Sequence, residues 1–343
     1  MRERPLRVLR ALGILLVAAA TASAQPAPQR VIFDTDMGND VDDALALAVL
    51  HALESRGESR LLAVTLTKDE PYAAPYVDIL NTFYRRPDVP IGVARSGVTP
   101  APDFQTTVAQ MRGPDGAPLY PHDLVDGRQA PEATVVLRRA LAAQPDGSVV
   151  LVQTGFSTNL ARLLDTPGDS LSPLGGRELV ARKVRVLEMM AGRFDVASPA
   201  DFIEFNVQKD IPAARALFDR WPTPIEVSGF EVGVAVTYPA ESIRRDYAYV
   251  AHHPVADGYI NYRGARWPYD RPTWDVTSVL QAIFPDRGYF GRSAAGRVTV
   301  DERGRTTFRE EANGPHRFLT VSTEQAIRAR EAMVQLASQP PGR

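Results

Sequence analysis

The sequence predicts an α/β fold in which a mainly parallel central sheet is flanked by helices. Apolar runs of strand length alternate with segments of helical period, and no internal repeat is visible. Such alternation is typical of βαβ units. A group of aspartates directly follows the first apolar run of the predicted sheet, where open α/β sheets bind ligands. The 343 residues suffice for a sizeable core, and the absence of cysteine excludes disulfides and thiolate metal sites.

The first 24 residues have the pattern of a secretory signal peptide. Arginines precede the apolar run ALGILLVAAA, and Ala22-Ser23-Ala24 supplies small residues at a cleavage position. A transmembrane anchor would need a longer apolar segment. We therefore expect an exported protein, periplasmic or secreted after cleavage near Ala24, whose mature form (25–343) is a single domain.

The predicted elements follow the alternation along the chain. Strands are expected at 30–34, 61–67, 89–93, 148–153, 184–190 and 224–230. Helical segments separate them, most clearly at 42–56 and 132–144. Residues 95–128 are rich in Gly, Pro, Asp and Gln and predict a long loop, and about 239–275 predicts an irregular insertion on the substrate side. Short strands at 298–310 and 317–322 and a helix from Thr323 to about Leu336 complete the chain.

The charge distribution points to a small-molecule ligand. The formal net charge is −2, and acidic and basic residues are interspersed. This pattern lacks the basic footprint that a nucleic acid or an anionic membrane would require. We expect no nucleic-acid partner and no membrane association of the mature form; a homo-oligomer is possible.

Five aspartates lie within ten positions in VIFDTDMGNDVDDALALAVL (31–50). Carboxylates this close repel each other, so they must share protons, accept hydrogen bonds or bind a cation. Asp42 and Asp43 fall in the first turn of a predicted helix, where negative charge is favourable, and ordinary N-capping is the alternative for each of them. A divalent metal explains the whole group best.

Two other kinds of acidic site fit the aspartate group less well. An EF-hand loop needs its glycine at the sixth position and a closing glutamate, whereas Gly38 is fifth from Asp34 and Leu45 stands at the closing position. A phosphatase with an aspartyl nucleophile would normally have a hydroxyl residue where Gly38 stands.

Five segments together resemble the nucleoside hydrolases, in the family order, over roughly residues 30–285. They are DTDMGNDVDDALAL, VLVQTGFSTNLARLL, VLEMMAGRF, IEFNVQKDIPAA and RPTWDVTSVL. The resemblance implies a Rossmann-like nucleoside-hydrolase domain and hydrolysis of the N-glycosidic bond of ribonucleosides with bound Ca²⁺. An all-oxygen ligand set suits this hard cation.

The resemblance also implies a role for each matching residue. Calcium ligands would be the carboxylates of Asp36, Asp43 and Asp275 and the backbone carbonyl of Thr154. Ribose would contact Asp42, Met190, Glu204 and Asn206. Asp36 would also take the proton of the attacking water as general base. Asp40 is an additional acid, expected to be an acceptor behind the ligands or a partner of the loop.

Two positions depart from the family pattern. Trp274 stands where purine-cleaving members have a histidine that assists the departing base, and an indole cannot titrate but can stack on a base. Substitutes for the histidine would be His252, His253, Tyr259, Tyr262 and Arg263, although a surface or packing role is the commoner one for such residues. Glu70 occupies the place of a family asparagine and is expected either to contact the substrate, favouring a cationic ligand, or to pair with Lys68 or an arginine.

These patterns lead to one hypothesis and two alternatives. We expect an exported, calcium-dependent ribosylhydrolase acting on a nucleoside. One alternative is the hydrolysis of another N-ribosyl compound, and the other is a calcium-dependent ribose-binding protein without turnover.

Overall fold

The structure is a computed structural model that describes residues 27–98, 104–195, 201–263 and 266–342. The expected signal peptide therefore lies outside the described residues. The main sheet consists of β1 (Gln29–Thr35), β2 (Ser59–Leu66), β3 (Ile91–Val93), β4 (Val149–Gln153), β5 (Val184–Met190), β6 (Ile225–Ser228), β9 (Gly291–Arg292), β10 (Gly296–Val300), β11 (Thr306–Glu310) and β12 (His316–Thr320). Their order is β11-β10-β12-β6-β5-β4-β1-β2-β3, with β9 paired to β12.

The six strands predicted first, β1 to β6, are confirmed, and neighbouring pairs among them run parallel. The antiparallel pairs of this sheet all involve the C-terminal strands β9 to β12. The chain runs outward through β1, β2 and β3, then returns to place β4 on the other side of β1. The connections diverge at this switch point, which leaves a crevice at the carboxyl ends of β1 and β4.

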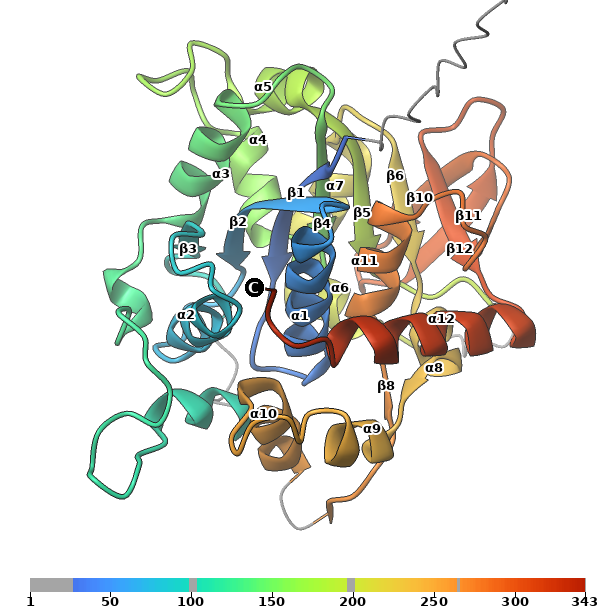
Figure 1. The fold of residues 1–343 in the computed structure, drawn as a ribbon. Helices are drawn as coiled ribbons and strands as arrows, with labels where there is room; N and C mark the ends of the chain where they lie inside the picture. Colours follow the sequence, from blue (N-terminus) through green and yellow to red (C-terminus); the bar gives the residue numbers. More distant parts are fainter. Residues whose placement is uncertain (1–26, 99–103, 196–200, 264–265, 343) are drawn as a thin grey trace, which may run out of the picture.

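Helices cover both faces of the sheet (Figure 1). One face carries α1 (Asp42–Ser55), α2 (Ala73–Phe83), α11 (Asp275–Ile283) and α12 (Thr323–Ala337), and α10 (Pro254–Arg263) packs against α1 and α2 beyond the strand ends. The other carries α3 (Ala133–Ala142), α4 (Thr158–Leu164), α5 (Gly176–Lys183) and α7 (Ile211–Arg220). Strand β1 shows why two cores form, because Val31 and Phe33 belong to the first and Ile32 to the second, as expected for alternating side chains.

The segment 239–275 was expected to be irregular, which is correct only in part. It contains α9 (Ala240–Arg245), α10 and β8 (Arg271–Pro272), and β8 pairs with β7 (Thr237–Tyr238). Prolines precede or open both helices, where a missing N–H costs nothing, and this signal is hidden by the aromatic residues of the segment. In Figure 1 the segment lies below the sheet, at the carboxyl ends of its parallel strands.

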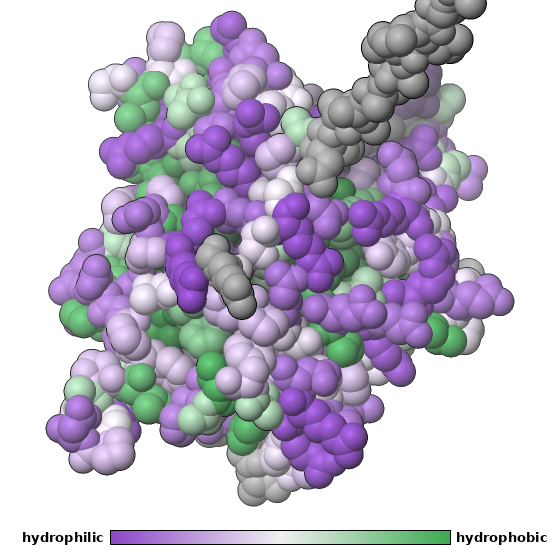
Figure 2. Space-filling model, in the orientation of Figure 1, coloured by the Kyte–Doolittle hydropathy of each residue, from purple (hydrophilic) through white to green (hydrophobic). Residues whose placement is uncertain are grey.

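A long loop was predicted at 95–128, and the described parts of that range, 95–98 and 104–128, contain the short 3₁₀ helix η1 (Phe104–Gln110) and the start of η2 (Gly127–Gln129). Two short helices complete the described elements, α6 (Phe205–Lys209) and α8 (Phe230–Ala235). Within the described ranges, no helix has the length and hydropathy needed to span a membrane. Figure 2 shows one face of the molecule, on which hydrophilic residues predominate and hydrophobic ones form small separate areas.

A buried histidine on α1 gives the fold a predicted pH dependence. His51 is 3% exposed, stacks on Tyr84 and places Nε2 2.9 Å from Oδ1 of Asn81. Burial lowers the pKa of His51 to about 4. Since the unfolded chain binds this proton near pH 6.5 and the folded chain does not, this contribution to stability is complete above pH 6.5 and is lost as the pH falls toward 4.

We expect the His51 ring to titrate below pH 5 in an NMR titration of the folded protein. Between pH 7 and pH 5 the free energy of unfolding should fall by about 2 kcal/mol more in the wild type than in His51→Gln, whose side chain does not titrate. Denaturant unfolding at both pH values measures this difference. Titration near pH 6.5, or equal pH dependence of the two proteins, would contradict the assignment.

Candidate active site

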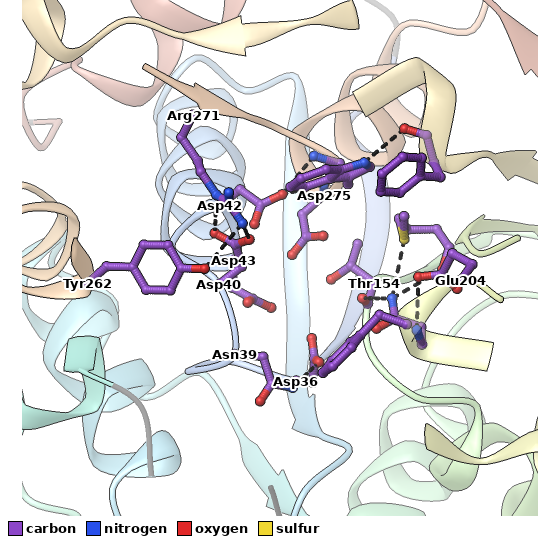
Figure 3. Close-up of a pocket in the computed structure, with 15 residues that line it drawn as sticks. Asp36, Asn39, Asp40, Asp42, Asp43, Thr154, Glu204, Tyr262, Arg271 and Asp275 are labelled. Atoms are coloured by element: carbon purple, nitrogen blue, oxygen red, sulfur yellow. Dashed lines mark hydrogen bonds and ion pairs between the residues drawn. The ribbon is translucent and has the colours of Figure 1, made fainter. Parts of the chain in front are cut away.

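A cavity of about 300 Å³ lies at the carboxyl ends of β1, β4 and β5 (Figure 3). Nine of the ten residues predicted for the site line it: Asp36, Asp42, Asp43, Thr154, Met190, Glu204, Asn206, Trp274 and Asp275. They come from five separate segments of the chain. The fold therefore brings together residues that the sequence separates by as many as 239 positions, Asp36 and Asp275.

The ends of β1 and β4 are held close together at the base of the cavity. The N–H of Thr154 donates to the carbonyl of Asp34 at 2.7 Å. A Cβ at Gly155 would lie 2.5 Å from the backbone nitrogen of Asp36 and from Oγ1 of Thr67. Only glycine fits this approach, which sets the Thr154 carbonyl beside the Asp36 segment.

Three buried carboxylates, those of Asp42, Asp43 and Asp275, meet where α1 and α11 begin. Each offers an oxygen within 4.8 Å of the others. Asp42 Oδ2 accepts from the backbone N–H groups of Trp274 at 2.7 Å and Asp275 at 3.1 Å, so it caps α11. Thr35 Oγ1 donates to Asp43. These bonds hold the carboxylates of Asp42 and Asp43 in place and fix the start of α11.

Burial makes negative charge costly throughout the site. It raises the pKa of Asp36 to about 6 and those of Asp42 and Glu204 to about 7. Burial raises the pKa values of Asp43 and Asp275 well above their usual range, and neighbouring carboxylates raise them further. A bound cation would offset this repulsion. Every side chain in the cluster offers carboxylate oxygens as ligands, so the cluster suits a hard divalent ion.

Asp36 lines the same cavity, beside the three-carboxylate cluster. Asn39 Nδ2 donates to its Oδ2, and Lys68 Nζ donates to Asn39 Oδ1 at 3.4 Å. Lys68 is fully buried and its charge favours the ionised form of Asp36. The carboxylate is thus held in one orientation, as a proton acceptor requires.

The opposite wall carries polar groups suited to a sugar. Glu204 caps α6, accepting from the N–H groups of Asn206 at 2.8 Å and Val207 at 3.1 Å. Asn206 Nδ2 donates to the Thr154 carbonyl at 2.7 Å and lies 3.3 Å from the sulfur of Met190. A carbonyl oxygen has two lone pairs, so this bond leaves Thr154 able to bind a metal.

The third side of the cavity is aromatic and carries Arg271. The Arg271 guanidinium binds Asp40, with Nε 3.0 Å from Oδ1, and donates to the Tyr262 hydroxyl at 3.1 Å. It also lies 5.2 Å from the centre of the Trp274 ring. Asp40 therefore pairs with the insertion, whereas the sequence predicted an acceptor behind the ligands or a partner of the loop.

Trp274 packs tightly where the family histidine would stand. Its indole N–H donates to the carbonyl of Phe230 at 2.9 Å, and its ring stacks on that of Phe230 at 5.7 Å. A Cβ at Gly233 would lie only 2.1 Å from the Trp274 ring, so glycine is required there. The indole N–H is consequently occupied within the protein.

Of the residues considered as substitutes for the histidine, Tyr262 lines the cavity. Tyr259 and His253 are buried in the aromatic packing of the insertion, and His252 lies 3.5 Å from Asp257. The side chain of Arg263 lies outside the described residues.

Glu70 stands apart from the residues that line the described cavity. Its Oε2 accepts from the backbone N–H groups of Tyr72 at 2.9 Å and Ala73 at 2.6 Å, at the start of α2. The charge of Lys68 favours its ionised form, whereas burial raises its pKa. Capping explains its position, and its contact with a substrate stays a prediction.

Four lining residues were missed by sequence reasoning: Asn39, Phe205, Phe230 and Arg271. Phe205 had a usable signal, since it lies between Glu204 and Asn206 in a segment already singled out. Asn39 lay inside the aspartate group. Arg271 opens the quoted segment RPTWDVTSVL, but nothing in that segment indicated that its side chain lines the site, and Phe230 had no signal. The positions of both depend on the path of the insertion and of α8.

Comparisons with known proteins agree with this geometry. The family model described as inosine-uridine preferring nucleoside hydrolase matches residues 31–335. Similar solved structures include a plant nucleoside hydrolase (21% identity, TM-score 0.66, covering 91% of this chain and 100% of that one). Another is the inosine-uridine preferring nucleoside hydrolase of Bacillus anthracis (19%, 0.64, 90% and 99%). A third is the type III effector protein XopQ complexed with adenosine diphosphate ribose (18%, 0.67, 92% and 95%).

No curated protein matches the chain. At these identities the solved structures support the fold, whereas the family model covers most of the sequence. The chain belongs to the nucleoside hydrolase family and is a hydrolase acting on N-glycosyl compounds.

Proposed function

We propose that this protein is an exported, calcium-dependent ribosylhydrolase that cleaves the N-glycosidic bond of a ribonucleoside. The observation that carries the proposal is the meeting of Asp42, Asp43 and Asp275 in one buried cluster, in a cavity also lined by Asp36 and Thr154. Oxygen ligands of this kind suit Ca²⁺. Export rests on the sequence of residues 1–24 alone.

Asp36, Asp43, Asp275 and the Thr154 carbonyl would hold the ion. When bound, Ca²⁺ makes a coordinated water more acidic and fixes ribose hydroxyls. Asp36, oriented by Asn39, accepts the proton of the water that attacks the anomeric carbon. Asp42, Glu204 and Asn206 bind the sugar, and the carboxylates of Asp42 and Glu204 stabilise the positive charge that the ribose gains in the transition state.

The proposal is tested by measuring ribose release, as reducing sugar, from a panel of purine and pyrimidine ribonucleosides. Release from at least one of them is expected. Binding of free ribose without release from any riboside would instead support the non-catalytic alternative. The alternative substrate class, another N-ribosyl compound, draws support from the solved XopQ structure, which contains adenosine diphosphate ribose.

We expect Trp274→Ala to raise KM for substrates with an aromatic base by about 10-fold, because base stacking on an aromatic residue contributes roughly 1–3 kcal/mol. The indole lines the cavity beside Phe230. Steady-state kinetics with an aromatic nucleoside measures the effect. Trp267→Ala, outside the cavity, serves as the control and should leave KM unchanged. An unaltered KM in Trp274→Ala would count against stacking.

A further inference from the structure

We propose that the preferred substrates are ribosides whose leaving group is a cationic aromatic nitrogen base, such as a ribosylpyridinium. This inference rests on the proposed function and specifies its substrate class. Three features carry it: the lack of a histidine among the described residues on the leaving-group side, the excess of acidic residues in the cavity as a whole, and the aromatic wall.

The first feature is the set of proton donors near the leaving group. No histidine is among the described residues that line the cavity. The Trp274 N–H donates to the protein backbone, and the Arg271 guanidinium, which does not release its proton at neutral pH, is bound to Asp40. Tyr262 is a phenol, and phenols are weak acids at neutral pH. A neutral base leaves slowly without a proton.

The second feature is the charge of the cavity. Six acidic residues line it: Asp36, Asp40, Asp42, Asp43, Glu204 and Asp275. Arg271 is the one basic residue among the described lining residues, and Asp40 neutralises it. A bound divalent ion would favour the ionised forms of the other five acidic groups, and that ion and Lys68, behind the wall, would supply three positive charges against them. The cavity thus favours a ligand that brings positive charge.

The third feature is the aromatic wall. Phe205, Phe230, Tyr262 and Trp274 line the cavity, and Phe205 is 43% exposed. Aromatic faces attract flat organic cations through the ring quadrupole. Figure 3 shows Tyr262 and Arg271 on the side of the cavity away from Glu204, so the wall continues beyond the sugar-binding groups.

The chemistry of a cationic riboside matches this site. As the bond between C1′ and the ring nitrogen breaks, its electron pair goes to the nitrogen, and the base departs neutral without accepting a proton. Water forms the new bond to C1′ and gives one proton to Asp36, which later releases it to solvent. Each turnover therefore yields ribose, a neutral pyridine and one proton.

The test compares kcat/KM for a β-D-ribosylpyridinium salt, its neutral 1,4-dihydropyridine analogue, inosine and uridine, using the full-length mature protein with calcium. We expect kcat/KM for the cationic substrate to be about 100-fold higher than that for each neutral one. This factor is the lower end of the rate enhancement that a general acid contributes. Equal or faster hydrolysis of inosine or uridine would overturn this inference and leave the proposed function standing. Hydrolysis of none of the four would also overturn this inference, and the full ribonucleoside panel would then decide whether the proposed function stands.

A charge variant tests the mechanism of selection. Asp40→Asn is nearly isosteric and leaves Arg271 without a compensating charge, so kcat/KM for the cationic substrate should fall about 10-fold more than that for inosine. Asp165→Asn is the matched control, since Asp165 pairs with Arg220 at the surface, away from the cavity, and both substrates should be unaffected. An equal loss for both substrates in a folded, calcium-binding Asp40→Asn protein would overturn the charge argument.

Discussion

Replacing Asp36 by asparagine is expected to lower kcat by about 10³-fold, within the range that general bases contribute. The change is isosteric and keeps an oxygen for the Asn39 amide, but it removes the group that takes the proton of water. Steady-state kinetics of ribose release measures the loss. Because Asp36 is also an expected calcium ligand, the assay must run at saturating calcium, with the affinity of the variant measured by calorimetry.

Asp78→Asn provides the matched control for the Asp36 variant. Asp78 is a buried aspartate whose carboxylate accepts from the backbone N–H groups of Asp123 and Leu124, both at 2.8 Å, outside the cavity. Its loss should lower the free energy of unfolding by about 1–3 kcal/mol with little effect on kcat. If Asp36→Asn retained a third or more of the wild-type kcat with calcium bound, another group would have to be the base.

The strands of the central sheet were predictable because their signal is local. Parallel strands buried on both faces appear as continuous apolar runs, as in VVLVQ before Thr154. The order of those strands was not predictable in the same way. The position of β4 beside β1 depends on contacts between residues far apart in sequence, which no periodicity records.

The candidate site was predictable where a motif keeps its residues near a strand end or a helix start. Asp36, Asp43 and Asp275 were named because the segments that hold them resemble those of the nucleoside hydrolases. Asp34 shows the limit of the argument, because it belongs to the same aspartate group as Asp36 but not to the cavity. In the structure its carboxylate is buried, accepts from Thr65 and Asn159, and does not line the cavity.

Arg271 was not predictable because its role depends on a partner 231 positions away. An arginine in a segment rich in aromatics and prolines usually faces solvent. Here β8 and α10 bring it over Trp274 and beside Asp40. The same pairing explains why an acidic residue stands at position 40, which the aspartate motif alone did not explain.

Removal of calcium is expected to abolish turnover and to lower the melting temperature by several degrees. At a calcium concentration 100 times its Kd, binding should add about 2.7 kcal/mol to the free energy of unfolding. The carboxylates of Asp42, Asp43 and Asp275 repel one another in the metal-free protein. Part of the stabilisation is the relief of this repulsion by the bound ion. Thermal unfolding and ribose release, each measured with chelator and after re-addition of calcium, provide the readouts.

Asp275→Asn separates the ion from other effects of the chelator. Asp275 begins α11 while Asp43 lies in α1, so the ion would link two helices that are far apart in sequence. Without the Asp275 carboxylate the protein should fold and lose most of its response to calcium, and its melting temperature without calcium should equal or exceed that of the metal-free wild type, because one repelling charge is gone. Asp257→Asn, an aspartate outside the cavity that accepts from Tyr120, should keep the full calcium response. If calcium stabilised the Asp275→Asn protein as strongly as the wild type, the cluster would not be the metal site.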